Sequence, residues 1–320
     1  MSKSKQPNHS TTKHNHENCE HHNHTEHHDH AHCGHDHSHE NHDHVHCGHD
    51  HSHEHHDHTH CGHDHSHENH QRYVFSEKET QHYESLSLEN LMQQADDFLS
   101  GEEFGKVVPI FEIALAKIQT TKNLQDINYL NELINIKQNL AFAYGIIGEH
   151  TKAIPLWKSV IEHKEQNMDD VSDLLDDYFG IALSCEQCEM QDDFLMYIQK
   201  GLNLARENQF PEYVASFEHE LGGFYCDLSE FKKAEKHLES AIKIREKLGD
   251  IVGLAMSKMY MGILFEDQKK YPEAKQFYEK ALELTKNQDF CDELVGERAE
   301  LELRLSKIKN LSLKDKLFSI

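Results

Sequence analysis

Histidine and cysteine dominate the first 70 residues in a repeated pattern. The stretch "HCGHDHSHENHDHV", residues 32–45, places one thiol and four imidazoles within eight residues, from His32 and Cys33 to His39. Gly34 allows the backbone to turn tightly beside the cysteine. Thiolate and imidazole together are the ligands that suit tetrahedral Zn²⁺, and Ni²⁺ and Cu²⁺ also bind imidazole strongly. The pattern predicts a metal-binding segment, with Zn²⁺ as the first choice and Ni²⁺ or Cu²⁺ left open.

The segment repeats with a period of 14 residues, at 32–45, 46–59 and 60–70, with a diverged copy at 18–31. So many near-equivalent ligands favour storage or transfer of several ions over catalysis, which needs one fixed geometry with an open position. A compositionally biased, merely solubilising tail is the alternative. The candidate metal ligands are Cys19, His21, His28, His30, His32, Cys33, His35, His37, His39, His42, His44, His46, Cys47, His49, His51, His53, His60, Cys61, His63, His65 and His67.

The composition changes sharply near residue 71. Residues 1–70 hold 27 of the 32 histidines and almost no Leu, Ile or Phe, so we expect them to be disordered. The remaining residues carry Leu, Ala, Ile, Phe and Tyr at helical spacing, which is enough for a buried core. The chain therefore divides into a metal-binding tail and a helical body.

Acidic residues exceed basic ones in both parts. The net charge is −25, with four basic against twelve acidic residues in 1–72 and 28 against 45 in the rest. Such a charge repels nucleic-acid backbones and anionic membranes, so we expect neither as a partner. The sequence shows no apolar run that could serve as a signal peptide or membrane span, which predicts a cytoplasmic protein whose eight cysteines are thiols or metal ligands.

Two successive segments of the body share small and aromatic residues at fixed offsets. "LGGFYCDLSEFKKAEKHLESAIKI", residues 221–244, and "MGILFEDQKKYPEAKQFYEKALEL", residues 261–284, align Gly222 with Gly262 and Ala234 with Ala274. This pattern resembles the tetratricopeptide repeat, in which small residues let two helices cross closely. Weaker copies lie at 88–118, 140–163 and 181–204.

The resemblance implies an all-α, TPR-like solenoid of about five extended helix pairs. Its anchor positions are 107, 153, 194, 234 and 274, separated by 46, 41, 40 and 40 residues, which exceeds the usual repeat of about 34. The extra length is similar to that of kinesin light chains and bacterial peptide-sensing regulators. We expect a linker at 71–85, the solenoid at 86–288, and a C-terminal capping helix and tail at 289–320.

In this family the first helices of the pairs form a groove that receives a peptide or protein. Projecting the pattern places a mixed apolar and acidic set there, which suits an apolar or basic segment of a partner. The lysine clamp of chaperone-binding members is missing, which disfavours a cochaperone role. The candidate groove residues are Gln138, Phe142, Asp176, Phe179, His219, Asp227, Met256, Met259 and Glu266.

The body shows no motif for catalysis. A Gly-rich phosphate loop, a nucleophile elbow and HExxH are all missing from the sequence, and we expect no enzymatic activity. A hydrolytic body would need Asp176, Asp227 and Glu266 to converge on one metal. Cys185 occupies the slot of Tyr225 in the later unit, so we expect it to be a buried core residue. The sequence predicts an adaptor that binds a protein and binds, buffers or delivers metal; the alternative is a scaffold or peptide-responsive regulator whose tail only senses metal or solubilises. The oligomeric state stays open.

Overall fold

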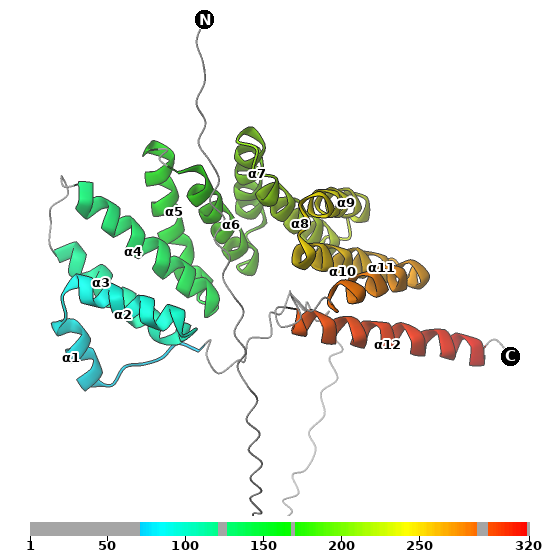
Figure 1. Cartoon of the computed structure of the whole chain (residues 1–320), viewed down its shortest axis with the longest axis horizontal. Helices are drawn as coiled ribbons and strands as arrows, with labels where there is room; N and C mark the ends of the chain where they lie inside the picture. The colour runs from blue at the N-terminus through cyan, green and yellow to red at the C-terminus, as the bar shows by residue number, and fades with distance from the viewer. Residues whose placement is uncertain (1–70, 121–126, 168–169, 287–293, 319–320) are drawn as a thin grey trace, which may run out of the picture. The chain divides into compact units, whose positions relative to one another are not determined.

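A computed structural model describes residues 71–120, 127–167, 170–286 and 294–318 of the chain. These residues form twelve α-helices and no strand (Figure 1). The helices are α1 (Glu77–Ser85), α2 (Leu88–Ser100), α3 (Phe104–Thr120), α4 (Ile127–Ile146), α5 (His150–Asn167), α6 (Val171–Gln187), α7 (Gln191–Glu207), α8 (Pro211–Asp227), α9 (Phe231–Leu248), α10 (Ile251–Asp267), α11 (Tyr271–Leu284) and α12 (Val295–Phe318).

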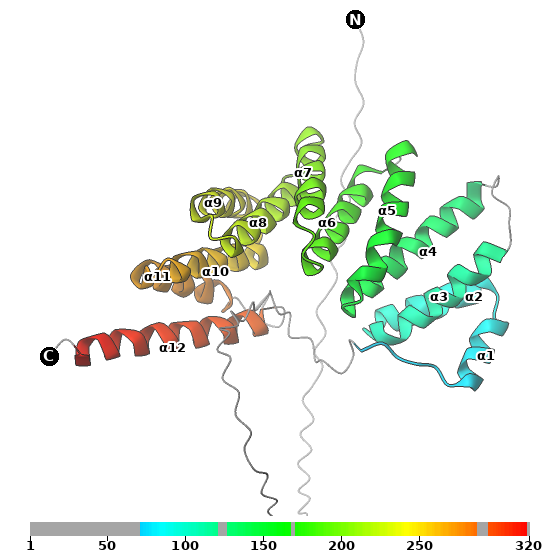
Figure 2. The same ribbon diagram turned by 180° about the vertical axis from the view of Figure 1, so that it is seen from behind.

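The helices from α2 to α11 form five pairs. Each helix packs mainly against its neighbours in the chain, most extensively α8 against α9 and α10 against α11 (Figure 2). We call α2, α4, α6, α8 and α10 the first helices and α3, α5, α7, α9 and α11 the second helices. First helices of adjacent pairs also touch, as α4 does with α6 and α8 with α10. The fold is a TPR-like helical solenoid, as the sequence pattern predicted.

The turn inside every pair has the same geometry. One residue adopts a positive φ, and the amide of the next residue donates a hydrogen bond of 2.8 to 2.9 Å to a carbonyl five residues back. This is the hydrogen bond of a Schellman helix end, which satisfies a carbonyl at the helix terminus. The positive-φ residues are Glu102, Gly148, Glu189, Ser229 and Lys269. Their spacing equals that of the predicted anchors, so the structure confirms the repeat register.

The anchors lie where the two helices of a pair meet. Val107, Ala153, Phe194, Ala234 and Ala274 are all fully buried. At the crossing of α10 and α11, a Cβ on Gly262 would lie only 3.0 Å from Cζ of Tyr278 and closer still to Cδ1 and Cε1 of its ring. The alanine anchors and Gly262 therefore let the helices approach, as expected, whereas Val107 and Phe194 fill the same position with larger side chains.

Cys185 follows the prediction, and Trp157 is a second core side chain at a helix crossing. Cys185 is fully buried, and burial raises the pKa of its thiol to about 11. Trp157 is buried against the α5–α6 crossing, where a Cβ on Gly180 would lie 2.8 Å from the indole. These side chains serve packing.

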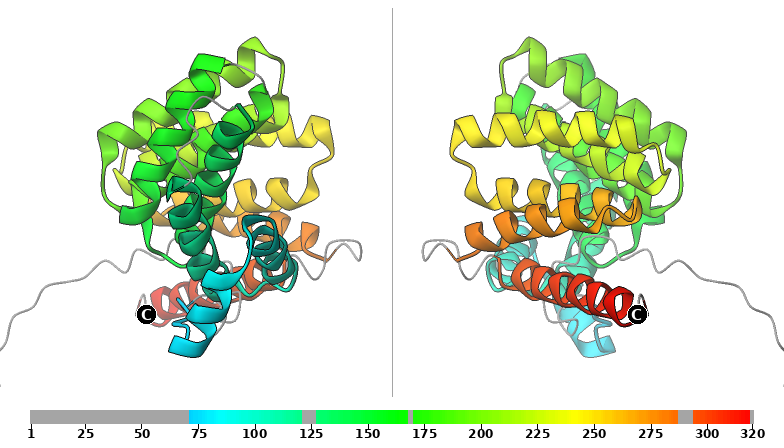
Figure 3. Two further views of the ribbon diagram at one scale, coloured as in Figure 1. Left: turned by 90° about the vertical axis from the view of Figure 1, so that its left-hand side faces the viewer. Right: turned by 90° about the vertical axis from the view of Figure 1, so that its right-hand side faces the viewer.

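Both ends of the body carry a helix outside the five pairs. Residues 77–85, expected to belong to a linker, form α1, whose N-terminus has a capping box between Ser76 and Glu79. At the other end α12 packs against α11, as expected for a capping helix (Figure 3). Arg304 of α12 forms an ion pair with Glu266 of α10 at 3.0 Å and lies over the ring of Tyr278. The described helices include none that is long and apolar enough to span a bilayer.

Candidate protein-binding face

The predicted metal ligands, from Cys19 to His67, lie outside the described residues. Among the residues that the structure does describe, no group of three or more His, Cys, Asp and Glu side chains could hold a metal ion. Of the cysteines in this part, Cys185 and Cys226 are buried and Cys188 is half-buried. Among the described residues, the candidate site is the surface of the first helices.

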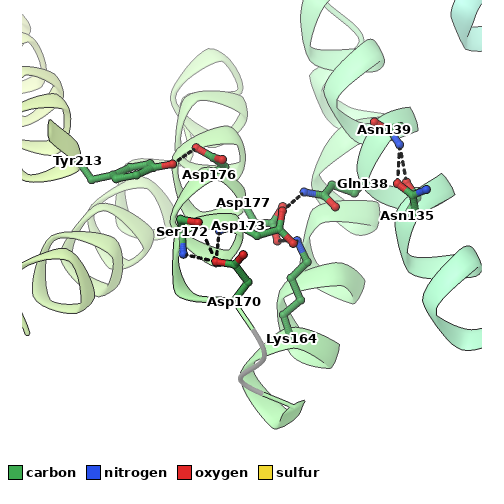
Figure 4. Close-up of polar contacts among 10 residues, drawn as sticks. All are labelled: Asn135, Gln138, Asn139, Lys164, Asp170, Ser172, Asp173, Asp176, Asp177 and Tyr213. Carbon is green, nitrogen blue, oxygen red and sulfur yellow. Dashed lines mark hydrogen bonds and ion pairs between the residues drawn. The ribbon is translucent and has the colours of Figure 1, made fainter. Parts of the chain in front are cut away.

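We define the first-helix face as the solvent-open side of α4, α6, α8 and α10. On α4 it carries two carboxamides: Asn139 donates from Nδ2 to Oδ1 of Asn135 at 2.8 Å and to its carbonyl oxygen at 3.0 Å (Figure 4). Gln138 reaches from α4 to α6, where its Nε2 donates to Oδ1 of Asp173 at 2.8 Å. Carboxamides offer both donors and acceptors, as a peptide backbone does.

Four acidic residues mark the N-terminal part of α6. Asp170 caps the helix by accepting from the backbone amides of Ser172 and Asp173, where the helix dipole favours a carboxylate. Lys164 of α5 forms ion pairs of 2.6 Å with both Asp173 and Asp177 (Figure 4). Asp177 is fully buried, and burial raises the pKa of its carboxyl to about 6 although Lys164 opposes the shift. These carboxylates already have hydrogen-bond or ion-pair partners within the fold.

Asp176 points instead toward α8, where it accepts a hydrogen bond of 2.8 Å from the hydroxyl of Tyr213 (Figure 4). Burial and this hydrogen bond raise the pKa of Tyr213. A cavity of about 510 Å³ opens beside this contact and is lined by Ser172, Phe210, Glu212, Tyr213 and Ser216. The N-terminal halves of α6 and α8 thus border an open cavity lined by hydroxyl groups, one carboxylate and a phenyl ring.

The C-terminal halves of the same helices carry carboxylates that the sequence prediction missed. Glu186 on α6 and Glu220 on α8 are both half-buried. Burial, together with the negative charges of Glu220 and Asp227, raises the pKa of Glu186 to about 8. Burial likewise raises the pKa of Glu220 to about 7, while Arg245 opposes the shift. The surrounding protein therefore leaves these two carboxylates poorly solvated without closing them off from solvent.

The structure separates the nine predicted groove residues into three groups, the third being Glu266, which is half-buried but bonded within the fold. The side chains of Gln138, Phe142, Asp176, Phe179, Asp227 and Met256 are exposed or half-buried on the first-helix face, and Phe142 is 49% exposed. His219 and Met259, by contrast, are buried.

The buried and internally bonded members have partners within the fold. His219 Nδ1 lies 3.2 Å from the hydroxyl of Ser257, and burial lowers the pKa of this imidazole to about 3. Glu266 accepts a hydrogen bond of 2.5 Å from Tyr278 and pairs with Arg304. Glu220 follows the buried His219 in the sequence, Tyr260 follows the buried Met259, and both are half-buried. A shift of one residue on a helix turns a side chain by about 100°.

Comparisons with known proteins agree with this fold. Residues 213–287 match the family model of the tetratricopeptide repeat. These residues are similar to tetratricopeptide repeats, and the body as described has a TPR-like helical fold. No curated protein matches the sequence.

Solved structures share the solenoid at low sequence identity. RapI in its apo form is 16% identical with a TM-score of 0.59, covering 73% of this chain and 86% of that one. A kinesin light chain of Podosopora anserina with TPR-like repeats is 15% identical with a TM-score of 0.51, covering 63% and 96%. A STAND protein of Pyrococcus horikoshii with a tetratricopeptide repeat sensor is 19% identical with a TM-score of 0.51, covering 68% of this chain and 33% of that one. At this identity the likeness shows the fold alone.

Proposed function

We propose that this protein is a non-enzymatic adaptor with two binding activities. Its solenoid binds a protein partner through the first-helix face, and residues 1–70 bind, buffer or deliver Zn²⁺, or Ni²⁺ or Cu²⁺ in its place. The observation that carries the first activity is the continuous row of amide, phenyl and carboxylate side chains on α4, α6 and α8. TPR solenoids are scaffolds for protein interaction, which supports the same assignment.

The second activity rests on the sequence of the tail. Each 14-residue unit supplies one thiol beside a glycine and several imidazoles, a ligand set that suits Zn²⁺. Because imidazolium cannot coordinate a metal, we expect the tail to release metal as the pH falls below about 6.5.

Zinc competition tests the tail. The full-length chain is titrated with Zn²⁺ against a chromophoric chelator and compared with a variant in which Cys19, Cys33, Cys47 and Cys61 are replaced by serine. We expect the variant to lose the tightest sites. Cys188→Ser is the matched control, because this half-buried body cysteine lies in no metal-ligand group among the described residues. Equal zinc uptake by all three proteins would show that the cysteine repeats have no role in binding.

Site-specific cross-linking tests the solenoid. A benzophenone amino acid is placed at Phe142 on the first-helix face or at Met196 on α7, two exposed positions of similar openness at 49% and 42%. We expect a partner to cross-link at position 142 and to spare position 196. Deleting residues 1–70 then distinguishes the adaptor from a scaffold whose tail is incidental. In both cases the cross-link is kept, but only an adaptor loses its function under zinc limitation. Labelling at both positions alike would contradict a dedicated face.

A further inference from the structure

The open strip between α6 and α8 is the least closed part of the first-helix face. First helices of neighbouring pairs contact each other at α4–α6 and at α8–α10, but in the described structure α6 and α8 touch at most marginally. Their solvent-open positions follow one another at helical spacing, so each helix presents one row of side chains to the strip. The exposed or half-buried residues of these rows are Asp176, Phe179, Leu183 and Glu186 on α6, and Tyr213, Ser216, Glu220 and Asp227 on α8.

Glu186 and Glu220 differ from the other carboxylates of this face in their partners. Asp173 and Asp177 are paired with Lys164, and Asp176 accepts from Tyr213. None of the described side chains forms a hydrogen bond or an ion pair with Glu186 or Glu220, although the strip holds both of them half-buried. Half-buried carboxylates are normally paired or hydrogen-bonded, because burial without a partner is costly.

The charges around the two carboxylates are mostly negative. The negative charges of Glu220 and Asp227 on α8 raise the pKa of Glu186. Among the described groups, Arg245 of α9 is the one cation that lowers the pKa of Glu220. Arg245 is itself committed elsewhere, since its Nη1 donates to the carbonyl of Gly253 at 2.7 Å and to Ser257 at 2.6 Å. A cation supplied from outside would therefore gain both charge pairing and hydrogen-bond acceptors here.

The other end of the strip fits a peptide backbone. The cavity beside Tyr213 is lined by three hydroxyl groups, the carboxylate of Glu212 and the phenyl ring of Phe210. Phe179 lies between the two ends, with its ring 5.6 Å from that of Phe217. An extended segment spans about 3.3 Å per residue, so a few residues bridge the polar cavity and the two glutamates along helices of 17 residues each.

We propose that the strip between α6 and α8 binds an extended basic segment of the protein partner, with one lysine or arginine side chain seated between Glu186 and Glu220. This inference rests on the proposed protein-binding function and names the chemistry of the partner. The excess of acidic over basic residues in the body favours the same kind of partner at longer range.

Selection from a phage-displayed library of random 12-residue peptides tests the proposal. The full-length chain is immobilised in the presence of EDTA, and the affinity of the enriched peptide is measured by fluorescence anisotropy. We expect enrichment of lysine or arginine at one position. Glu186→Gln with Glu220→Gln should weaken binding of that peptide by at least about 10-fold, the effect of losing a charge-assisted hydrogen bond. Glu239→Gln, at an exposed position of α9, is the matched control and should leave it unchanged.

A double-mutant cycle makes the assignment independent of any change in folding. Replacing the enriched basic residue of the peptide by norleucine should weaken binding to the wild-type chain and have little further effect on the double variant. Affinity for the basic peptide should also rise from about pH 6 to about pH 8.5, because both glutamates must be ionised to pair with it.

Each alternative outcome is decisive. Enriched peptides without a basic residue, bound equally well by the double variant, overturn the inference and leave the proposed function standing. Recovery of no peptide overturns the inference as well. If position 142 also fails to cross-link to a partner, the proposed function fails with it.

Discussion

Replacing Gly262 by alanine should destabilise the C-terminal part of the solenoid. The new methyl group would meet Cδ1, Cε1 and Cζ of the Tyr278 ring, all at 3.0 Å or less, where carbon atoms normally pack at about 3.5 to 4.0 Å. The ring cannot move aside freely, because Tyr278 is fully buried, its hydroxyl donates to Glu266 and Arg304 lies over its face. Such overpacking costs about 1 to 3 kcal/mol, against a gain of about 0.5 to 1 kcal/mol from replacing a helical glycine.

A second glycine in a first helix provides the matched control. Nothing lies within 4 Å of a Cβ built on Gly145 of α4, so Gly145→Ala should show only the helix-propensity gain. The two variants should therefore differ by about 1 to 3 kcal/mol in the free energy of unfolding, with opposite signs relative to the wild type. Urea unfolding followed by circular dichroism measures both, and the single tryptophan, Trp157, reports separately on the unit that contains α5.

The refuting result is specific. If Gly262→Ala is as stable as Gly145→Ala, the close approach of α10 to the Tyr278 ring does not decide the packing of this pair. If Gly262→Ala lowers the unfolding midpoint seen by Trp157 as much as that seen by circular dichroism, the units unfold as one, and the effect is not confined to the C-terminal pairs.

Three further predictions concern charged and titratable groups. His219 is held neutral, with its pKa lowered to about 3, so the wild type should lose about 1.4 kcal/mol of stability per pH unit as the pH falls below about 6.5. His219→Gln should flatten that slope in urea titrations at several pH values. An unchanged slope would contradict this prediction. The pH dependence of stability that Asp177 contributes has the opposite sign. Its pKa is raised to about 6, so its carboxylate lowers the free energy of unfolding as the pH rises from about 4 to 6. Between about pH 4.5 and 7, the stability of Asp177→Asn should therefore rise by about 2 kcal/mol relative to that of the wild type. Arg304→Gln leaves Glu266 without its cation and should increase amide hydrogen exchange in α12 while sparing α2 to α5; uniform exchange across the body would show that Arg304 does not hold α12 in place.

The repeat architecture was predictable because it depends on core residues. The anchors from Val107 to Ala274 are all buried, and the turn of each pair lies five residues before its anchor. Such positions are restricted in residue type by close packing, so their spacing is readable from one sequence. Helix α1 also had a readable signal, since Ser76 and Glu79 have the spacing of a capping box, but its helix is short and buries no side chain.

The solvent-facing rows were less predictable than the core. The projection selected His219 and Met259, which are buried, whereas the neighbouring Glu220 and Tyr260 are only half-buried. A helix has 3.6 residues per turn, so spacings of three and four residues alternate, and an error of one position exchanges an open side chain for a buried one. Only the contacts of α8 with α9 and α10 fix that choice.

The repeat pattern did not predict the carboxylates of the strip between α6 and α8, and the unit formed by α6 and α7 explains why. Three other units share a set at their turn: a glutamate pairs with a lysine three residues later, and that lysine lies over an aromatic ring, as Lys106 does over Phe98 and Lys233 over Tyr225. In the α6–α7 unit the ring is replaced by Cys185 and the lysine by Asp193, which pairs with Lys158 of the preceding unit. This unit matches the repeat least well, yet its first helix supplies Glu186. A pattern that identifies units by their shared core is therefore least informative where one unit has departed from it, and the carboxylates that distinguish this solenoid lie in that unit and its neighbour.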